Sequence, residues 1–188
     1  MTDIDSVVFQ AWPKTPRLFR DMTITEKIDG TNAAIHVTPD GNVVAQSRNR
    51  LIYPDADNFG FARWVERYSM VLAEALGEGV HYGEWWGNGI QRGYGLANGD
   101  KRFSLFNAYR YADVSIPEIG LGVVPVLHHG IFDTLTVEDI VSLLRIDGSF
   151  AAPGFMRPEG VVVYHEAARS SFKVTIENDE KPKGAVKL

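Results

Sequence analysis

The sequence predicts an α+β fold in which antiparallel β-sheets pack against one or two helices. Segments with the pattern of strands outnumber those with the pattern of helices, and the two kinds do not alternate along the chain. The chain has 188 residues, 45% of them hydrophobic and 23% charged, a composition typical of a globular domain rather than a disordered chain. No stretch has the character of a linker, so we expect residues 1–188 to form a single domain.

The first third of the chain is predicted to be extended. Residues 23–27 and 32–38 have the composition of strands, although their alternation is imperfect. The sequence Pro-Asp-Gly-Asn at 39–42 is a strong turn signal, and residues 43–47 are predicted to return antiparallel to the preceding strand.

A helix is predicted between Phe61 and Leu76, where apolar residues recur at spacings of three and four. Asp57 or Asn58 is placed to cap its start, and Gly77 to end it. We expect the aromatic residues of this helix to pack in the core.

The remaining elements complete the predicted sheets. Strands are expected at residues 81–86, 102–110, 123–128, 159–165 and 171–176. A glycine-rich loop lies at 87–99, and a short helix is predicted to begin at Thr136 and reach about Arg145. The charged tail at 180–188 is expected to be loosely held.

Charge and composition exclude several classes of protein. The formal net charge of −5 excludes a globally basic nucleic-acid-binding protein, although a local basic groove stays possible. The absence of cysteine excludes disulfides, thiolate metal sites and cysteine nucleophiles. No apolar run is long enough to span a membrane, and the acidic N-terminus does not resemble a signal peptide. We therefore expect a soluble, cytoplasmic protein without a membrane partner.

The most informative segment is residues 26–32, Glu-Lys-Ile-Asp-Gly-Thr-Asn. Lys27 is expected near a strand end, directly before a turn that contains Gly30. A lysine amine becomes a nucleophile when burial or neighbouring cations lower its pKa, and glycine lets the backbone approach a phosphate or base closely. Taken alone, the segment is equally compatible with a surface lysine before a β-turn.

Further motifs follow this segment in order, and together they are more specific than any one of them. Residues 26–32 resemble the lysine motif K-x-D/H-G of the covalent nucleotidyltransferases, which include ATP-dependent DNA ligases, RNA ligases and mRNA capping enzymes. The longer form E-K-x-x-G-T-N is most similar to the RNA ligases. The other motifs that resemble this family are residues 47–50 (SRNR), 82–87 (YGEWWG), 89–91 (GIQ), 103–109 (FSLFNAY), 158–163 (PEGVVV) and 172–175 (FKVT).

The resemblance implies the adenylation domain of an ATP-dependent RNA ligase. Lys27 would attack the α-phosphorus of ATP, form lysyl-AMP, and pass AMP to a nucleic-acid 5′-phosphate for end sealing. Glu26 would help to recognise adenine, partly through its backbone. Asn32 and Arg48 would contact the ribose and phosphate, and Glu84 would accept hydrogen bonds from the ribose hydroxyls.

The later motifs imply the rest of a nucleotide site. Phe106 would stack on adenine, because an aromatic face binds a base without polar partners. Phe103 is the alternative if the strand register differs. Glu159 would act near a divalent metal, Mg²⁺ or Mn²⁺, which suits oxygen ligands and a triphosphate. Lys173 would neutralise the α-phosphate.

Two departures from the family pattern stand out. Thr175 occupies the position of the second lysine in the family's K-x-K motif, and a hydroxyl cannot supply its charge. Lys181 and Lys183 in the tail are candidate replacements. Only a short tail follows Lys173, so we expect neither an OB-fold nor a C-terminal helical domain. Nucleic acid, with RNA favoured over DNA, would then be bound by basic residues of the domain or with help from a partner protein; the candidates are Arg48, Arg50, Arg92, Lys101 and Arg102.

Alternatives stay open at this point. The chain could be a minimal DNA nick ligase, or a catalytically weak module that binds nucleotides or nucleic-acid ends. Glu84 could face solvent from an edge strand, Glu159 could be a turn residue, and Arg48 could be a surface charge. Of the adjacent Trp85 and Trp86, which point to opposite faces of a strand, one is expected in the core while the other could line a groove.

Overall fold

The computed structural model describes residues 8–177 and 179, which form two β-sheets with helices on their outer faces. The four-stranded sheet has the order β10-β9-β1-β8, with all neighbours antiparallel. Its strands are β1 (Asp21–Lys27), β8 (Val126–Ile131), β9 (Gly160–His165) and β10 (Ser170–Thr175). The predicted α+β class with antiparallel sheets is confirmed.

The second sheet has six strands in the order β4-β3-β2-β5-β6-β7, and only the β6–β7 pair is parallel. Its strands are β2 (Thr31–Val37), β3 (Val43–Ser47), β4 (Leu51–Ile52), β5 (Gly79–Gly87), β6 (Lys101–Leu105) and β7 (Leu121–Val123). The predicted antiparallel return of residues 43–47 onto the preceding strand is observed. Short 3₁₀ turns lie at Gly93–Gly95 and Pro117–Ile119.

The predicted helix over residues 61–76 is interrupted at Tyr68, which separates α1 (Phe61–Arg67) from α2 (Ser69–Leu76). The apolar spacing does not reveal this break because both halves face the same core cluster. The Asp57 carboxylate accepts hydrogen bonds from the backbone N–H groups of Ala62 and Arg63 in the first turn of α1. The N-cap position itself is occupied by Gly60. Gly77 ends α2, as predicted.

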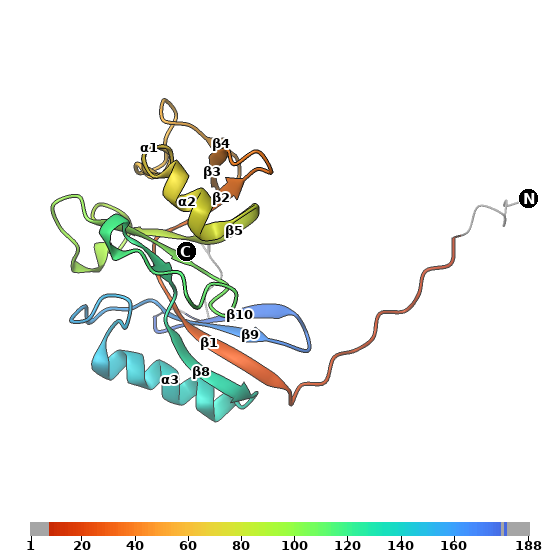
Figure 1. Cartoon of the computed structure of the whole chain (residues 1–188). Coiled ribbons are helices and arrows are strands. Elements are labelled where there is room, and N and C mark those ends of the chain that lie inside the picture. Colours follow the sequence, from red (N-terminus) through yellow and green to blue (C-terminus); the bar gives the residue numbers. More distant parts are fainter. Residues whose placement is uncertain (1–7, 178, 180–188) are drawn as a thin grey trace, which may run out of the picture.

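The second predicted helix, α3 (Thr134–Asp147), begins two residues before the predicted start. Asp133 is its cap, with its carboxylate accepting the N–H groups of Leu135 and Thr136. Val137, Val141 and Leu144 pack on the four-stranded sheet. In Figure 1, α3 covers this sheet, while α1 and α2 cover the other.

Two predicted strands were placed wrongly, and both errors affect the site. Residues 123–128 do not form one strand, because Pro125 lacks an N–H and separates β7 in one sheet from β8 in the other. The Pro125 carbonyl instead accepts the N–H of Glu26. The strand predicted at 102–110 ends at Leu105, where a turn begins in which the Asn107 side chain accepts the N–H of Arg110.

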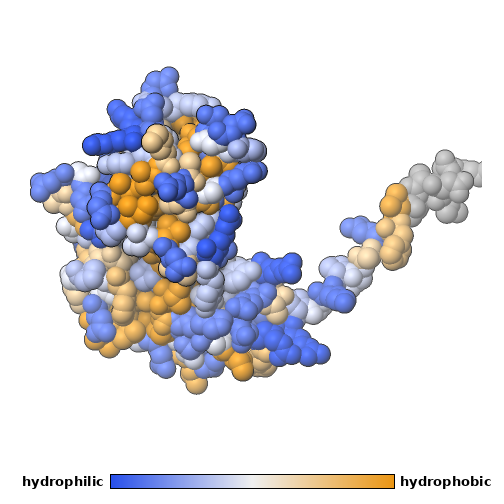
Figure 2. Space-filling view, viewed as in Figure 1, coloured by the Kyte–Doolittle hydropathy of each residue, from blue (hydrophilic) through white to orange (hydrophobic). Residues whose placement is uncertain are grey.

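Residues 8–17 form an extended, exposed arm that leaves the body of the molecule, with apolar side chains such as Phe9 and Trp12 facing solvent (Figure 2). The arm ends at Leu18, whose carbonyl oxygen lies within hydrogen-bond distance of His165 Nε2, at 2.6 Å. No helix among the described residues is long and apolar enough to cross a membrane. The tail at 180–188, with Lys181 and Lys183, lies outside the described residues.

The six-stranded sheet depends on the packing of α2, and this generates a stability prediction. Leu72 is fully buried in the core cluster, so Leu72→Ala is expected to lower the free energy of unfolding by about 2–5 kcal/mol. Urea denaturation with an unchanged m-value measures this loss. Met70→Ala is the matched control, because Met70 on the same helix is 83% exposed and its truncation is expected to change stability by less than about 0.5 kcal/mol. Equal losses in the two variants would contradict this packing.

Candidate active site

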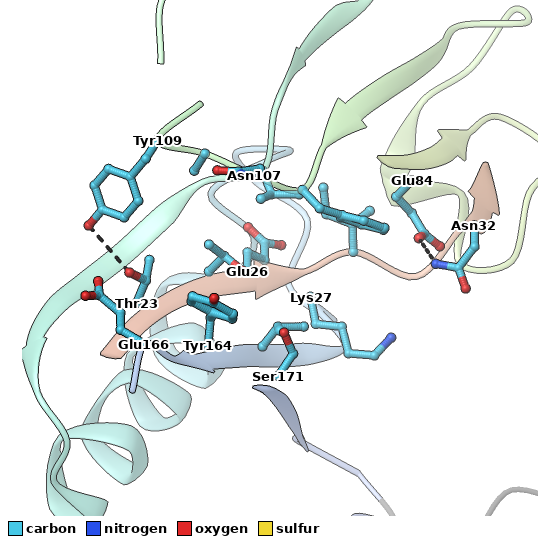
Figure 3. A pocket seen from close by; sticks show the side chains of 16 residues that line it. Thr23, Glu26, Lys27, Asn32, Glu84, Asn107, Tyr109, Tyr164, Glu166 and Ser171 are labelled. Atoms are coloured by element: carbon cyan, nitrogen blue, oxygen red, sulfur yellow. Dashed lines mark hydrogen bonds between the residues drawn. The ribbon is translucent and has the colours of Figure 1, made fainter. Parts of the chain in front are cut away.

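A cavity of about 540 Å³ opens between the two sheets, a size typical of small-molecule sites. Lys27, Asn32 and Glu84 lie at one end of it, and Thr23 and Tyr109 lie at the other (Figure 3). The walls come from β1, β2, β5, β9, β10 and the loop after β6. Strands of both sheets therefore contribute to one cavity.

Lys27 is the last residue of β1, and its ammonium lies 2.5 Å from Glu159 Oε2. Both side chains are largely buried, with exposed fractions of 20% for Lys27 and 10% for Glu159. They meet because Glu159 directly precedes β9, whose first residue, Gly160, pairs with Lys27. Glu159 is therefore an ion-pair partner of the lysine rather than an exposed turn residue.

Glu84 lies on β5 directly across from Asn32 on β2. Its carboxylate accepts a hydrogen bond from the Asn32 side-chain amide at 2.9 Å and from the Gly30 N–H at 3.0 Å. Burial raises the pKa of Glu84 to about 7; the charge of Lys27 opposes this rise and that of Glu159 adds to it. The carboxyl group is thus poised between its two protonation states near neutral pH and does not face solvent.

Gly30 allows the turn after β1 to lie close to β5, the strand that carries Glu84. A Cβ atom at this position would meet the backbone oxygen of Trp85 and lie 2.7 Å from the Trp86 Cβ. Only glycine lets the turn after β1 pack directly against β5. The glycine of the lysine motif therefore brings the Lys27 strand and the Glu84 strand together.

Glu26 is among the residues that line the cavity, but its carboxylate is held by the loop after α3. Successive side chains of a strand alternate between faces, so Glu26 faces away from the side of β1 that carries Lys27. Its carboxylate accepts hydrogen bonds from Ser149 Oγ, Phe150 N and Ala151 N in the loop after α3. Burial raises the pKa of Glu26, and these hydrogen bonds oppose the rise. Of the expected contact with adenine, only the part through the Glu26 backbone is compatible with this geometry.

Phe106 lines the cavity and is 42% exposed. It lies one residue beyond β6, which is why its ring is free of the sheet. Val162 of β9 lines the cavity from the other sheet. Phe103, the alternative stacking residue, is fully buried in the core beside Phe61 and has no access to the cavity.

Lys173 and Thr175 lie on β10 across from Val162 and Gly160 of β9. Directly paired residues share a face of the sheet, so Lys173 projects on the side of Val162, and Thr175 lies in the row of Lys27. Lys173 is exposed and is not part of the cavity wall. The Thr175 hydroxyl donates to the Glu177 carbonyl.

Arg48 stands apart from this group. It lies in the exposed turn after β3 and is not part of the cavity wall. Arg92, one of the other basic candidates, pairs with Asp29 at 3.0 Å and donates to the carbonyls of Arg157 and Pro158. Arg92 thus ties the turn after Lys27 to the segment that carries Glu159.

The two tryptophans after Glu84 are both buried, each 2% exposed, on opposite faces of β5. Trp85 belongs to the core cluster beneath α1, and Trp86 packs edge-on against Tyr94. The expectation that one of them could line a groove is wrong, because packed elements cover both faces of β5 at this point.

Sequence reasoning missed the residues at the far end of the cavity. They are Thr23, Tyr109, Tyr164, Glu166 and Ser171. Alternation along β1 was sufficient to place Thr23 on the face of Lys27. The others depend on the pairing of β1, β9 and β10 or on the turn after β6, which no local pattern reveals.

No group of three or more His, Asp or Glu side chains within residues 8–177 is arranged to hold a metal ion. Mg²⁺ usually binds through one or two carboxylates together with waters and substrate phosphates. The single carboxylate of Glu159 beside Lys27 fits that kind of site, in which substrate oxygens complete the ligand set.

Solved structures share this fold. One is a Naegleria gruberi RNA ligase variant with AMP and Mn, with a TM-score of 0.61, 20% identity, and coverage of 84% of this chain and 50% of that one. Another variant of that ligase, with ATP and Mn, has a TM-score of 0.60 and 22% identity over 82% and 48% of the two chains. An archaeal ATP-dependent RNA ligase has a TM-score of 0.60 and 20% identity over 88% and 48%. The chain spans about half the length of these proteins.

A comparison with curated protein sequences finds no match. The family model described as RNA ligase, in contrast, matches residues 20–175, which include every strand and helix around the cavity. The matched segment includes Lys27, Glu84, Glu159 and Lys173. The chain therefore belongs to the RNA ligase family, and its fold is that of the family's nucleotidyltransferase domain.

Proposed function

We propose that this protein is an ATP-dependent RNA-ligase-type nucleotidyltransferase that forms lysyl-AMP at Lys27 and transfers AMP to a nucleic-acid 5′-phosphate. The observation that carries the proposal is the position of the Lys27 amine, which lies at one end of a nucleotide-sized cavity beside Glu159. Family membership and the solved relatives with ATP or AMP support the choice of nucleotide.

The cavity provides a place for each part of the nucleotide. The base would lie between Phe106, in the loop after β6, and Val162 on β9, both of which offer apolar faces. Glu84, held by Gly30 and Asn32, would accept hydrogen bonds from the ribose hydroxyls. With the base and ribose bound in this way, the α-phosphate would lie at Lys27.

In the first step the neutral Lys27 amine attacks the α-phosphorus. A nitrogen–phosphorus bond forms, the bond to the β-phosphate oxygen breaks, pyrophosphate leaves, and the amine loses a proton to solvent. Before the attack, the ion pair with Glu159 would hold the ammonium in place until it loses its proton. Lys173 on β10, two strands away from β1, would offset phosphate charge. A divalent ion, Mg²⁺ or Mn²⁺, would be held by Glu159 and would neutralise the triphosphate.

In the later steps AMP passes to a 5′-phosphate, and a 3′-hydroxyl displaces it to seal the strand. The sequences E-K-x-x-G-T-N and G-I-Q favour RNA as the substrate. Arg48 is exposed in the turn after β3 and would contact the nucleic acid rather than the nucleotide in the cavity. A partner protein that supplies further strand contacts and a cytoplasmic setting stay predictions from the sequence.

Covalent labelling tests the proposal. Incubation with α-labelled ATP and Mg²⁺ or Mn²⁺, followed by a denaturing gel, is expected to leave label on the wild-type chain. Lys27→Ala and Lys27→Arg are both expected to abolish it, because a guanidinium is not a nucleophile. Lys14→Arg, in the exposed arm, is the control and should label normally. Label that persists in Lys27→Arg would refute Lys27 as the nucleophile.

The pKa of Glu84 generates a pH prediction for nucleoside binding. Because this pKa is raised to about 7, the carboxyl group becomes a full acceptor only as the pH rises through neutrality. Adenosine, which has no phosphate to titrate, is expected to bind several-fold more tightly at pH 8 than at pH 6, as measured by calorimetry. Glu84→Gln should flatten this dependence.

A matched ligand isolates the contribution of the ribose. Binding of 2′,3′-dideoxyadenosine is expected to vary little between pH 6 and pH 8, since it lacks the hydroxyls that Glu84 would accept. An equal pH dependence for both nucleosides would show that Glu84 does not contact the ribose.

A minimal DNA nick ligase is the first of two alternative functions, and the choice of substrate distinguishes it from an RNA ligase. Side-by-side sealing of nicked RNA and nicked DNA duplexes is expected to favour RNA, and a preference for nicked DNA would indicate the minimal DNA ligase.

The other alternative is a module that binds nucleotide with little turnover. Thr175 favours it, because its hydroxyl lies in the row of Lys27, at the position where the family carries a second lysine. Absence of label with either metal would support that module.

A further inference from the structure

The end of the cavity far from Lys27 holds a cluster of polar side chains. Thr23 Oγ1 lies 3.2 Å from His129 Nδ1 and 3.5 Å from the Tyr109 hydroxyl. Glu166 Oε1 lies 3.8 Å from the same His129 nitrogen, and the rings of Tyr109 and His129 meet edge to face. These four residues come from β1, β8, the loop after β6 and the turn after β9, so only the tertiary fold assembles them.

Thr23 is the buried member of this cluster. It is 5% exposed and lines the cavity, whereas His129 and Glu166 are about half exposed. The strand register places His129 and Tyr164 on either side of it. The Thr23 hydroxyl donates its one hydrogen to the Tyr109 hydroxyl, so its oxygen can accept a further hydrogen bond, and the open direction at Thr23 is the cavity.

The spacing along β1 relates this cluster to a bound nucleotide. Thr23 lies four residues before Lys27 on the same face, about 13 Å along the strand. That is roughly the extended length of a nucleoside monophosphate. Val162 pairs with Thr25, which lies between Thr23 and Lys27 on β1. A nucleotide with its phosphate at Lys27 and its base beside Val162 would therefore bring the far edge of the base toward Thr23.

We propose that Thr23 reads the 6-amino edge of the purine, and that Tyr109, His129 and Glu166 are positioning residues that hold its hydroxyl. This inference rests on the proposed function, because the orientation of the nucleotide comes from Lys27. The edge of adenine offers an amino donor, and the Thr23 oxygen, whose hydrogen is donated to Tyr109, accepts from it. The apolar side chains of Phe106 and Val162 would stack on any purine, so the selection of adenine would depend on the polar cluster around Thr23.

The test compares two ligands that differ by a single group, AMP and purine riboside 5′-monophosphate, which lacks the 6-amino group. Calorimetry with the full chain is expected to show AMP binding about three- to tenfold more tightly, the range for one net hydrogen bond. The nearly isosteric Thr23→Val should bring the two affinities to within about twofold of each other. Thr134→Val, exposed at the start of α3, is the control and should keep the wild-type ratio.

Tyr109→Phe provides a second variant if Thr23→Val does not fold, and it should lower the ratio by a smaller factor. A wild-type ratio near one, an unchanged ratio in Thr23→Val, or no binding of AMP would each overturn the inference. Failure of the Lys27 chemistry is distinguishable, because covalent label would be absent while the AMP preference and its loss in Thr23→Val remained.

Discussion

The alternation of side chains along β1 is the constraint on which the rest of the structure depends. One face of this strand carries Met22 and Ile24 into the cluster beneath α3, and the other carries Thr23 and Lys27 into the cavity. A register shift of one residue would place the lysine in the core and an isoleucine in the cavity. The pairing with β9 and β8 on either side holds the register, and Glu26 adds three hydrogen bonds to the loop after α3.

Two largely buried carboxyl groups, those of Glu159 and Glu84, lie near Lys27. Glu159 pairs with the amine, whereas Glu84 is satisfied by an amide and a backbone N–H and has a pKa near 7. The charge of Glu159 adds to the rise in the pKa of Glu84, and the charge of Lys27 opposes it.

Much of this arrangement could be predicted from local patterns. The lysine motif, the strand that carries it, the hairpin that follows and the order of the later motifs are all local features of the sequence. The prediction placed Lys27, Asn32, Glu84 and Phe106 at one site, and the structure brings these four to the same cavity. Apolar spacing identified the helices but neither the break at Tyr68 nor the cap at Asp133, because spacing records which side of a helix is buried and not where its backbone bends.

Tertiary structure alone decided which side of each strand meets its neighbours. It bound the Glu26 carboxylate to the loop after α3, left Arg48 outside the cavity, and buried both Trp85 and Trp86. It also split the segment around Pro125 between two sheets and gathered Thr23, Tyr109, His129 and Glu166 at one end of the cavity. By itself the sequence determined the chemical groups and their order, since these are properties of single residues and short motifs. The approach of those groups to one another depends on pairing between strands that are distant in the chain, and only the folded molecule contains it.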